Sequence, residues 1–318
     1  MGFRRALDIF LAPKGAPDGM ALVPGGTFVM GSDRFYPEER PAHPARVGRF
    51  LMDRTPVTNA RFAAFVAATE YVTVAERMPD PARYPGVAAD RLVPGSLVFA
   101  PRTEGPNRGP ADWWRYVPGA CWRHPRGPGS DLDGRADHPV VHVAHEDAAA
   151  YAAWAGKRLP SEAEWEFAAR GGLKAADYAW GAELAPGGRR MAHIWPGGPF
   201  PLHAGETPPG TAAVGLHPAN GFGLLDMIGN VWEWTGDWYR VRHKAAEGAA
   251  GGQPSCCAAR AASLDPAQPG LPIPRKVLKG GSFLCAPDFC QRYRPAARQP
   301  QMIDSSSCHI GFRCVSDA

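Results

Sequence analysis

Two cysteines separated by four residues, Cys285 and Cys290, are the side chains in this sequence whose types and spacing best suit metal chemistry. Thiolates are soft ligands that select Cu(I), Zn²⁺ or iron–sulfur clusters over hard cations. A zinc site takes four protein ligands, or three and a water, and no Cys-x2-Cys pair occurs in the chain to complete one. Because Cu(I) accepts two thiolates, the lone pair favours copper over zinc.

The segment around these cysteines is expected to form a bent loop. Pro287 lies between them, which argues against a continuous helix, and a bend lets both sulfurs point the same way. Gly280 and Gly281 precede Ser282, where the backbone can approach a neighbour closely. From spacing alone, a local disulfide or two unrelated buried thiols are alternatives, since free cysteine is commonly a small buried hydrophobe.

Bulk composition predicts a globular chain rich in irregular backbone. The 318 residues carry a net charge of +4, too small and too scattered to indicate nucleic-acid binding. Gly 37 and Pro 34 together make 71 residues, well above the average usage of about 12%, so we expect little regular secondary structure. The apolar run at residues 9–12 is too short for a signal peptide, and no stretch approaches transmembrane length. With an odd number of cysteines, seven, these features predict a cytoplasmic protein without structural disulfides.

Hydrophobic periodicity and capping residues predict the elements that hold the cysteine loop. Thr58 is suited to cap one helix, and Ser161 with Glu164 forms a capping box for another. Two stretches rich in Gly, Pro and Ala are expected to be long loops, 79–110 and 243–275, the second containing Cys256 and Cys257. The expected strands lie within 23–32 and at 50–55 and 138–143, and the expected helices lie at 59–69, 146–155 and 161–170.

Three further sets of residues are candidates for binding. Trp113 and Trp114 follow the first long loop and suit either a peptide groove or the core. Asp226 and Glu233 could supply hard oxygen ligands for Ca²⁺, although two solvated acids are the default interpretation. His142 and His145 are expected to be satisfied structural residues.

Several motifs spread along the chain resemble one known family, that of the formylglycine-generating enzymes (sulfatase-modifying factors). The resemblance extends from about Met20 to Cys314. Cys285-x4-Cys290, followed by Arg292-Tyr293-Arg294 and Ala296-Ala297-Arg298, resembles the branch that generates formylglycine, in a bacterial form. The shared motifs are Val23-Pro24-Gly25-Gly26, Val57-Thr58-Asn59, Trp122-Arg123-His124-Pro125, His138-Pro139-Val140, residues 154–160, Glu162-Ala163-Glu164-Trp165-Glu166, Gly229-Asn230-Val231-Trp232-Glu233-Trp234, Gly280-Gly281-Ser282 and Gly311-Phe312-Arg313-Cys314.

The resemblance implies a single mixed α+β domain of the C-type-lectin-like, sulfatase-modifying fold at residues 20–318, after an extension at 1–19. It implies that O2 oxidises a cysteine in a Cys-x-Pro-x-Arg segment of an unfolded sulfatase to Cα-formylglycine. Cys285 and Cys290 match the family's Cu(I) ligands, Ser282 its active-site serine and Trp232 an active-site aromatic residue. The expected partners are the unfolded sulfatase and a thiol reductant, and a monomer is expected, with no membrane or nucleic acid involved.

The family's substrate-binding and calcium-binding residues are only partly matched in this sequence. Asp80 matches the family's aspartate for the substrate arginine, and Trp113 and Trp114 are expected to line the substrate groove, but Pro56 replaces a second acid. The family's second calcium site corresponds to Asp226, Gly229, Val231 and Glu233. At the first site, His193 and Thr207 are poor Ca²⁺ ligands, so that site is expected to be empty.

Two other interpretations of the same chain are weaker. A non-haem iron enzyme of the sulfoxide-synthase type would carry an extra helical domain with a histidine ligand set, and no such domain fits before Val23. A catalytically silent, lectin-like binding module would lack the cysteine pair. The sequence names neither the client sulfatase nor the reductant, and the roles of Cys256, Cys257 and Cys308 stay open.

Overall fold

The structure is a computed structural model that describes residues 19–102, 104, 109–174, 176–203, 205, 207–243 and 256–318. Most of the predicted N-terminal extension therefore lies outside the described residues. The helices are α1 (Asn59–Thr69), α2 (His145–Trp154), α3 (Glu162–Arg170) and α4 (Cys256–Ala261), with short 3₁₀ turns between them. The strands are β1 (Met20–Val23), β2 (Gly26–Met30), β3 (His43–Val47), β4 (Phe50–Asp53), β5 (Gly95–Phe99), β6 (Trp114–Pro118), β7 (Trp232–Trp238), β8 (Arg275–Lys279), β9 (Arg298–Met302), β10 (Ile310–Gly311) and β11 (Val315–Asp317).

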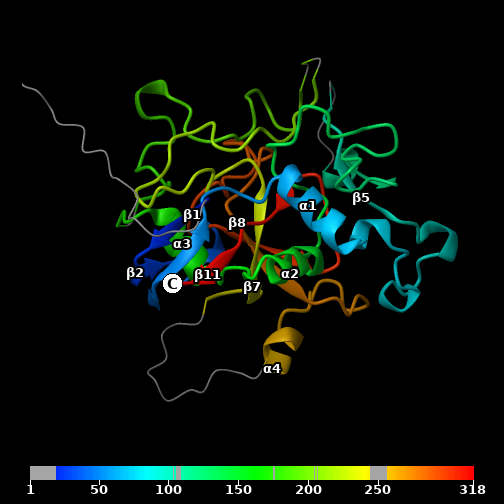
Figure 1. The fold of residues 1–318 in the computed structure, drawn as a ribbon, viewed down its shortest axis with the longest axis horizontal. Helices are drawn as coiled ribbons and strands as arrows, with labels where there is room; N and C mark the ends of the chain where they lie inside the picture. The colour runs from blue at the N-terminus through cyan, green and yellow to red at the C-terminus, as the bar shows by residue number, and fades with distance from the viewer. Residues whose placement is uncertain are drawn as a thin grey trace, which may run out of the picture.

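A four-stranded sheet in the order β10-β7-β8-β9 forms the centre of the molecule (Figure 1). β8 is antiparallel to both β7 and β9, whereas β10 runs parallel to β7 and pairs Ile310 with Trp232. Every residue of β8 is buried, and the strand leads directly into Gly280. The register of this sheet therefore places the start of β7, the end of β8 and the residues before β10 next to one another.

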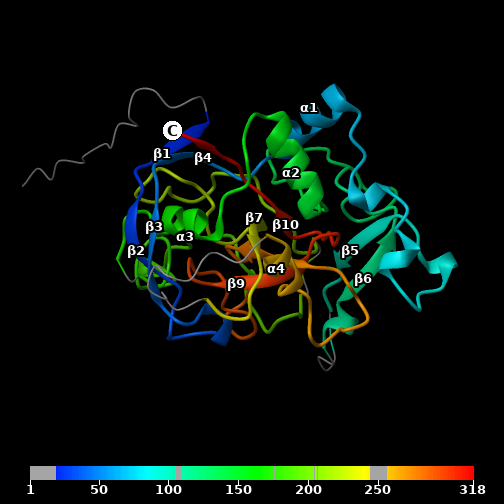
Figure 2. The same cartoon turned by 90° about the horizontal axis from the view of Figure 1, so that it is seen from below.

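A second sheet joins the two ends of the described chain. β4 is its central strand, paired antiparallel with β1 and with β11. Two smaller pairs, β2–β3 and β5–β6, complete the strands, and the β5–β6 hairpin lies at the opposite end of the molecule from β2 and β3 (Figure 2). Among the described residues, no helix is long and apolar enough to cross a membrane.

The helices α1 and α3 form where capping chemistry predicts them. Thr58 Oγ1 accepts a hydrogen bond from the backbone of Arg61 at the start of α1. At α3, Ser161 Oγ accepts from Glu164 N and the Glu164 carboxylate accepts from Ser161 N, which confirms the capping box. α3 ends at Gly171, whose φ of 57° lies in the left-handed region that glycine favours.

Three predicted segments differ from the structure. Residues 138–143 do not form a strand: the backbone there makes one bridge, from Pro139 to Thr58, and turns at His142 with φ 59°. The predicted loop 79–110 contains β5, because an apolar run near its end pairs with β6. The predicted loop 243–275 lies partly outside the described residues and also contains α4.

Candidate active site

The loop between β8 and β9 carries both cysteines, and its two glycines are required by close packing. Gly280 and Gly281 adopt φ values of 95° and 74°. A Cβ on Gly281 would lie 3.0 Å from the Cα of Tyr293, and one on Gly280 would lie 3.0 Å from the carbonyl oxygen of Met227. Side chains at these positions would push the loop away from the sheet.

The loop brings the two thiols together, as predicted. After Ala286 the chain bends, and Cys290 N donates to the Ala286 carbonyl at 2.9 Å. The two sulfur atoms, Cys285 Sγ and Cys290 Sγ, are 3.5 Å apart, and both residues are free cysteines that are buried. The bent loop is thereby confirmed, and the disulfide alternative does not describe this state.

The two thiols differ in acidity because they share a hydrogen bond. That bond lowers the pKa of Cys290 to about 6 and raises the pKa of Cys285 well above its usual value. The guanidinium of Arg292, with Nη1 3.9 Å from Cys290 Sγ, also favours the Cys290 thiolate. The pair therefore presents one thiolate at neutral pH, with the remaining proton on Cys285.

The residues after Cys290 are anchored to the segment around η1 (Pro37–Glu39). Glu38 Oε1 accepts hydrogen bonds from Arg292 Nε at 3.0 Å and Nη2 at 2.6 Å. The Arg292 guanidinium also lies 3.9 Å from the centre of the Tyr36 ring. Two residues further along, buried Arg294 forms an ion pair with Glu39. These contacts fix the position of the positive charge beside the thiolate.

The cysteine pair lies in a cleft of about 410 Å³ with aromatic walls. Four of the residues predicted for the site, namely Ser282, Trp232, Trp113 and Trp114, line the same cleft. Trp113 and Trp232 are buried and Trp114 is half-buried, so the tryptophans belong both to the core and to the cleft wall. The remaining lining residues are Leu97, Pro110, Phe200, Leu284, Phe289, Arg292, Gln299, Gln301, Ser307 and His309.

Several of these cleft residues were not identified as site residues from the sequence. Phe200 and Phe289 stack with ring centres 4.3 Å apart and form one rim. His309 Nδ1 lies 3.0 Å from Ser282 Oγ. Phe200 is remote in sequence from the loop, and nothing in its neighbourhood distinguishes it. His309 could have been found from its position immediately before β10.

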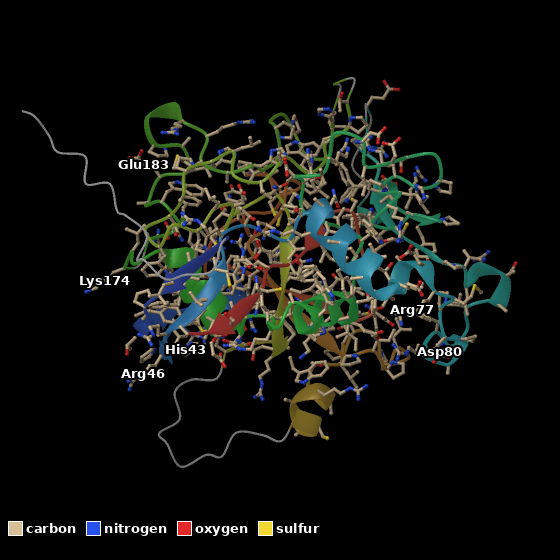
Figure 3. The ribbon with its side chains drawn as sticks, in the orientation of Figure 1. His43, Arg46, Arg77, Asp80, Lys174 and Glu183 are labelled. Atoms are coloured by element: carbon tan, nitrogen blue, oxygen red, sulfur yellow. The ribbon has the colours of Figure 1, made fainter. Side chains whose placement is uncertain are left out.

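A second groove, of about 470 Å³, contains Asp80 and adjoins the cysteine cleft at Leu97, which lines both. Asp80 is exposed, and its Oδ1 accepts from Ala82 N at 3.0 Å. Figure 3 shows Asp80 and Arg77 together at the end of the molecule opposite Lys174 and Glu183. Pro56 is buried and is not among the residues that line the groove.

Asp304 is a second acid in this groove, and it was missed from the sequence. Its side chain is 8% exposed, and Oδ2 accepts a hydrogen bond from Tyr84 at 2.9 Å. Oδ1 is buried and has no partner among the described residues. Arg83 lies between the two acids, 3.9 Å from Asp80 and 3.8 Å from Asp304. The groove therefore contains one exposed and one largely buried carboxylate, with the guanidinium of Arg83 between them.

At the predicted second calcium site, Glu233 is already paired. Its carboxylate accepts from Arg313 at 2.7 and 2.8 Å, and also from Trp165 Nε1 at 2.8 Å. Asp226 Oδ2 accepts from Gly215 N at 2.6 Å, and burial raises the pKa of this carboxyl. Gly229 and Val231 lie just before β7. The described parts of the chain contain no group of three or more acidic, histidine or cysteine side chains that could hold a metal ion. Glu233 would have to release Arg313 before its carboxylate could bind calcium.

At the predicted first calcium site, the His193 side chain and the Thr207 backbone each form a hydrogen bond within the chain. The ring of His193 bonds through Nε2 to the Gly210 carbonyl at 2.9 Å, and the Thr207 carbonyl accepts from His203.

Cys308 lies outside the cysteine cleft, where its sulfur accepts from Phe99 N and burial raises its pKa to about 12. His142 is buried and bonded through both ring nitrogens, as predicted, whereas Nε2 of His145 has no partner among the described residues.

This chain is similar to known proteins in both sequence and architecture. Residues 7–318 match the "Sulfatase-modifying factor enzyme 1-like domain". The chain is 55% identical to the formylglycine-generating enzyme of Mycobacterium tuberculosis, with 93% of this chain and 96% of that protein covered. It is 47% identical to the formylglycine-generating enzyme of Thermomonospora curvata over 96% of both. An "Inactive C-alpha-formylglycine-generating enzyme 2" from Mus musculus is 36% identical, covering 94% of this chain and 86% of that protein.

Solved structures show the same fold at lower identity. PvdO from Pseudomonas aeruginosa has a TM-score of 0.57 at 24% identity and covers 94% of both chains. Treponema denticola variable protein 1 has a TM-score of 0.53 at 16% identity, covering 94% of this chain and 95% of that one. The mixed α+β, C-type-lectin-like fold predicted from the sequence is confirmed. Since the domain match spans nearly the whole chain, this protein belongs to the sulfatase-modifying factor enzyme 1-like family.

Proposed function

We propose that this protein is a formylglycine-generating oxidase that acts on a cysteine of a sulfatase. The observation on which the proposal rests is the pair of free thiols, 3.5 Å apart, in a cleft walled by aromatic residues. Family membership alone does not decide activity, because a relative of 36% identity carries the word "Inactive" in its name. The relatives of 47 and 55% identity are named as formylglycine-generating enzymes.

The donor set fits Cu(I). Two soft sulfur donors lie side by side, and one of them is already a thiolate at neutral pH because the pKa of Cys290 is about 6. We infer that Cys285 and Cys290 would hold the ion, and that the substrate cysteine would lie in the cleft that both residues line. When bound, copper would supply the one-electron steps and the O2 chemistry that amino-acid side chains lack.

The overall reaction balances with O2 and a two-electron reductant. The substrate thiol with its methylene group, one O2, two electrons and two protons give an aldehyde, one hydrogen sulfide and one water. The substrate's C–S bond and one C–H bond break, and a C=O bond forms. A thiol reductant would supply the two electrons as it is oxidised to a disulfide.

The residues of the cleft have distinct roles in this proposal. Trp232, Trp113 and Trp114 form apolar walls that exclude water from the reacting sulfur. Ser282 offers a hydroxyl beside the thiols, held by a hydrogen bond from Leu284 N at 3.2 Å and by one shared with His309 Nδ1. Arg292 keeps a positive charge next to Cys290. Together they position the substrate cysteine and stabilise its neighbouring thiolate.

We infer that the groove with Asp80 takes the arginine of the substrate segment. It adjoins the cysteine cleft at Leu97, so an extended peptide can lie across both. Carboxylates form strong, directional pairs with guanidinium groups. Pro56 supplies no acid, and we infer that Asp304, which lines the same groove as Asp80, takes this role. A structural calcium at Asp226, a cytoplasmic location and a monomeric state stay predictions.

The proposal is tested by mass spectrometry of a peptide containing Cys-Thr-Pro-Ser-Arg. The protein, loaded with Cu(I), is incubated with the peptide, O2 and a thiol reductant. We expect conversion of the peptide's thiol to an aldehyde, lost in Cys285→Ser and in Cys290→Ser but retained in Cys308→Ser, a matched control outside the cleft. Cu(I) binding, measured by competition with a chromophoric chelator, should follow the same pattern.

Two negative outcomes have different meanings. Stoichiometric Cu(I) binding without conversion would contradict the proposed substrate and direct attention to the groove with Asp80. Absence of both Cu(I) binding and conversion would contradict the oxidase itself and favour a catalytically silent binding module of the same fold.

A further inference from the structure

Ser282 is held by a residue that lies 27 positions later in the chain. His309 Nδ1 is 3.0 Å from Ser282 Oγ, and both residues line the cysteine cleft. A serine hydroxyl on a loop would otherwise rotate among three staggered positions. The contact therefore restricts which way the hydroxyl of Ser282 points.

The imidazole of His309 is itself rigidly placed. The backbone carbonyl of His309 accepts a hydrogen bond from Trp232 N at 2.9 Å. The N–H of the preceding residue, Cys308, donates to the Leu97 carbonyl at 3.0 Å. The ring packs against Trp114 with centres 4.9 Å apart. Because β10 begins at the next residue and pairs with β7, the central sheet fixes His309 relative to the cleft.

The hydrogen-bonding capacity of Ser282 is nearly used up. A hydroxyl has one donor and two acceptor sites. Leu284 N donates to Oγ at 3.2 Å, and His309 Nδ1 takes a second site. One site is then left for a group in the cleft, which Ser282 lines.

His309 is unsuited to act as a base. Withdrawal of the ring from bulk water lowers its pKa to about 3, and an ordinary thiol has a pKa of about 8.5. Because the two pKa values differ by about five units, the proton stays on the thiol in preference to the imidazole by a factor on the order of 10⁵. A neutral imidazole in this place can orient the hydroxyl but cannot store the substrate's proton.

We propose that His309 is a positioning residue for the reaction, which fixes the Ser282 hydroxyl so that its one remaining hydrogen-bonding site faces the reacting cysteine. This inference rests on the proposed function of the cleft. His309 acts through Ser282 and makes no contribution of its own to copper or peptide binding. Loss of one such hydrogen bond changes rates about tenfold.

The test compares side chains that place a hydrogen-bonding atom differently. Asn at position 309 keeps such an atom near the place of Nδ1, Gln places it near Nε2, and Leu has none. We expect His309→Leu and His309→Gln to lower kcat for the Cys-Thr-Pro-Ser-Arg peptide about tenfold, with KM and Cu(I) affinity unchanged. His309→Asn should retain activity within about threefold of wild type.

A double-mutant cycle decides whether His309 acts through Ser282. In the Ser282→Ala background, His309→Leu should cause less than about a twofold further loss of kcat. The inference would be overturned if the losses of kcat in Ser282→Ala and His309→Leu multiplied in the double variant. It would also be overturned if Gln at position 309 restored activity and Asn did not, or if the Cu(I) affinity changed. Failure of the wild-type protein to convert the peptide would instead overturn the proposed function. Thermal unfolding of each variant identifies any loss that arises from misfolding, and His309→Asn keeps the test valid if Leu does not fold.

Discussion

Glu38 and Arg292 form an ion pair in which one carboxylate oxygen accepts hydrogen bonds from both Nε and Nη2 of the guanidinium, at 3.0 and 2.6 Å. The third nitrogen, Nη1, points toward Cys290 Sγ, 3.9 Å away. A residue near the start of the chain thus holds the charge beside a thiol near its end. The acidity of that thiol depends on a contact between segments 254 positions apart in sequence.

Metal-free protein should contain one cysteine that is reactive at unusually low pH. Because the hydrogen bond from Cys285 lowers the pKa of Cys290 to about 6, Cys290 is a thiolate above pH 6 and protonated below it. We expect its alkylation by iodoacetamide, followed by peptide mass spectrometry, to rise with a midpoint near pH 6. Cys285 should stay unmodified across the same range, since its pKa is raised. A midpoint near the ordinary thiol value of about 8.5 would contradict the shared hydrogen bond.

Arg292→Met should raise the pKa of Cys290. Removal of a positive charge about 4 Å from a thiolate disfavours the charged form, typically by about one pKa unit or more. The alkylation midpoint should therefore move upward, toward the ordinary thiol value. Arg34→Met is a suitable control, since Arg34 pairs with Asp177 at the surface. Equal midpoints in the two variants would show that Arg292 has no electrostatic role.

Much of the fold's local structure could be predicted because it depends on local chemistry. The capping box of Ser161 and Glu164 and the cap at Thr58 are short-range hydrogen bonds visible in the sequence. The prediction of a strand at residues 138–143 was wrong because an apolar run was expected to pair along its length. Instead the segment forms one bridge, to Thr58, and separate backbone hydrogen bonds to Val57 and Ser307. Strand pairing of this kind depends on distant segments and leaves no local signal.

The candidate site divides in the same way. The two cysteines share one loop, so their spacing revealed them, whereas the role of Ser282 came from the resemblance to a family. Phe200, His309 and Asp304 reach the cleft or groove only through the packing of separate segments. The resemblance to a family supplied Trp232 and Asp80, which spacing alone would not have identified.

The Glu233–Arg313 pair should be important for stability. Both side chains are buried, and Arg313→Met would leave Glu233 with Trp165 as its remaining side-chain donor. Breaking a buried pair by removing one partner typically costs about 3–5 kcal/mol of unfolding free energy. Urea denaturation should show a loss of this size, and the double variant Glu233→Met with Arg313→Met should recover part of it. A loss below about 1 kcal/mol, the range of surface pairs, would be inconsistent with this account.

Calcium binding at Asp226 is tested on protein stripped with a chelator. We expect isothermal titration with Ca²⁺ to show one site that is lost in Asp226→Ala and retained in Asp131→Ala, a change to an exposed loop acid. Burial raises the pKa of Asp226, so the affinity should fall as the pH decreases through that raised value and the carboxyl takes up a proton. A wild-type protein that binds no Ca²⁺ would show that the calcium prediction is wrong.

Asp304 should determine the preference for arginine together with Asp80. A charge-assisted hydrogen bond contributes about 1.5–3 kcal/mol, so Asp304→Asn and Asp80→Asn should each raise KM for a Cys-Thr-Pro-Ser-Arg peptide at least about tenfold. For the matched peptide ending in Ala, KM should not change, because the lost carboxylate has no partner there. Asp90→Asn, an exposed acid outside the groove, is the control.

Arg83 offers an independent check on the same groove. Its guanidinium lies 3.9 Å from Asp80 and 3.8 Å from Asp304, where a substrate arginine would compete with it. Arg83→Met should therefore lower KM for the arginine peptide, the opposite direction to the aspartate variants, and leave the alanine peptide unaffected. If Asp304→Asn raised KM equally for both peptides, the residue would support the groove's shape and not arginine recognition. An increase of KM in Arg83→Met would show that Arg83 assists binding and does not occupy the arginine's place.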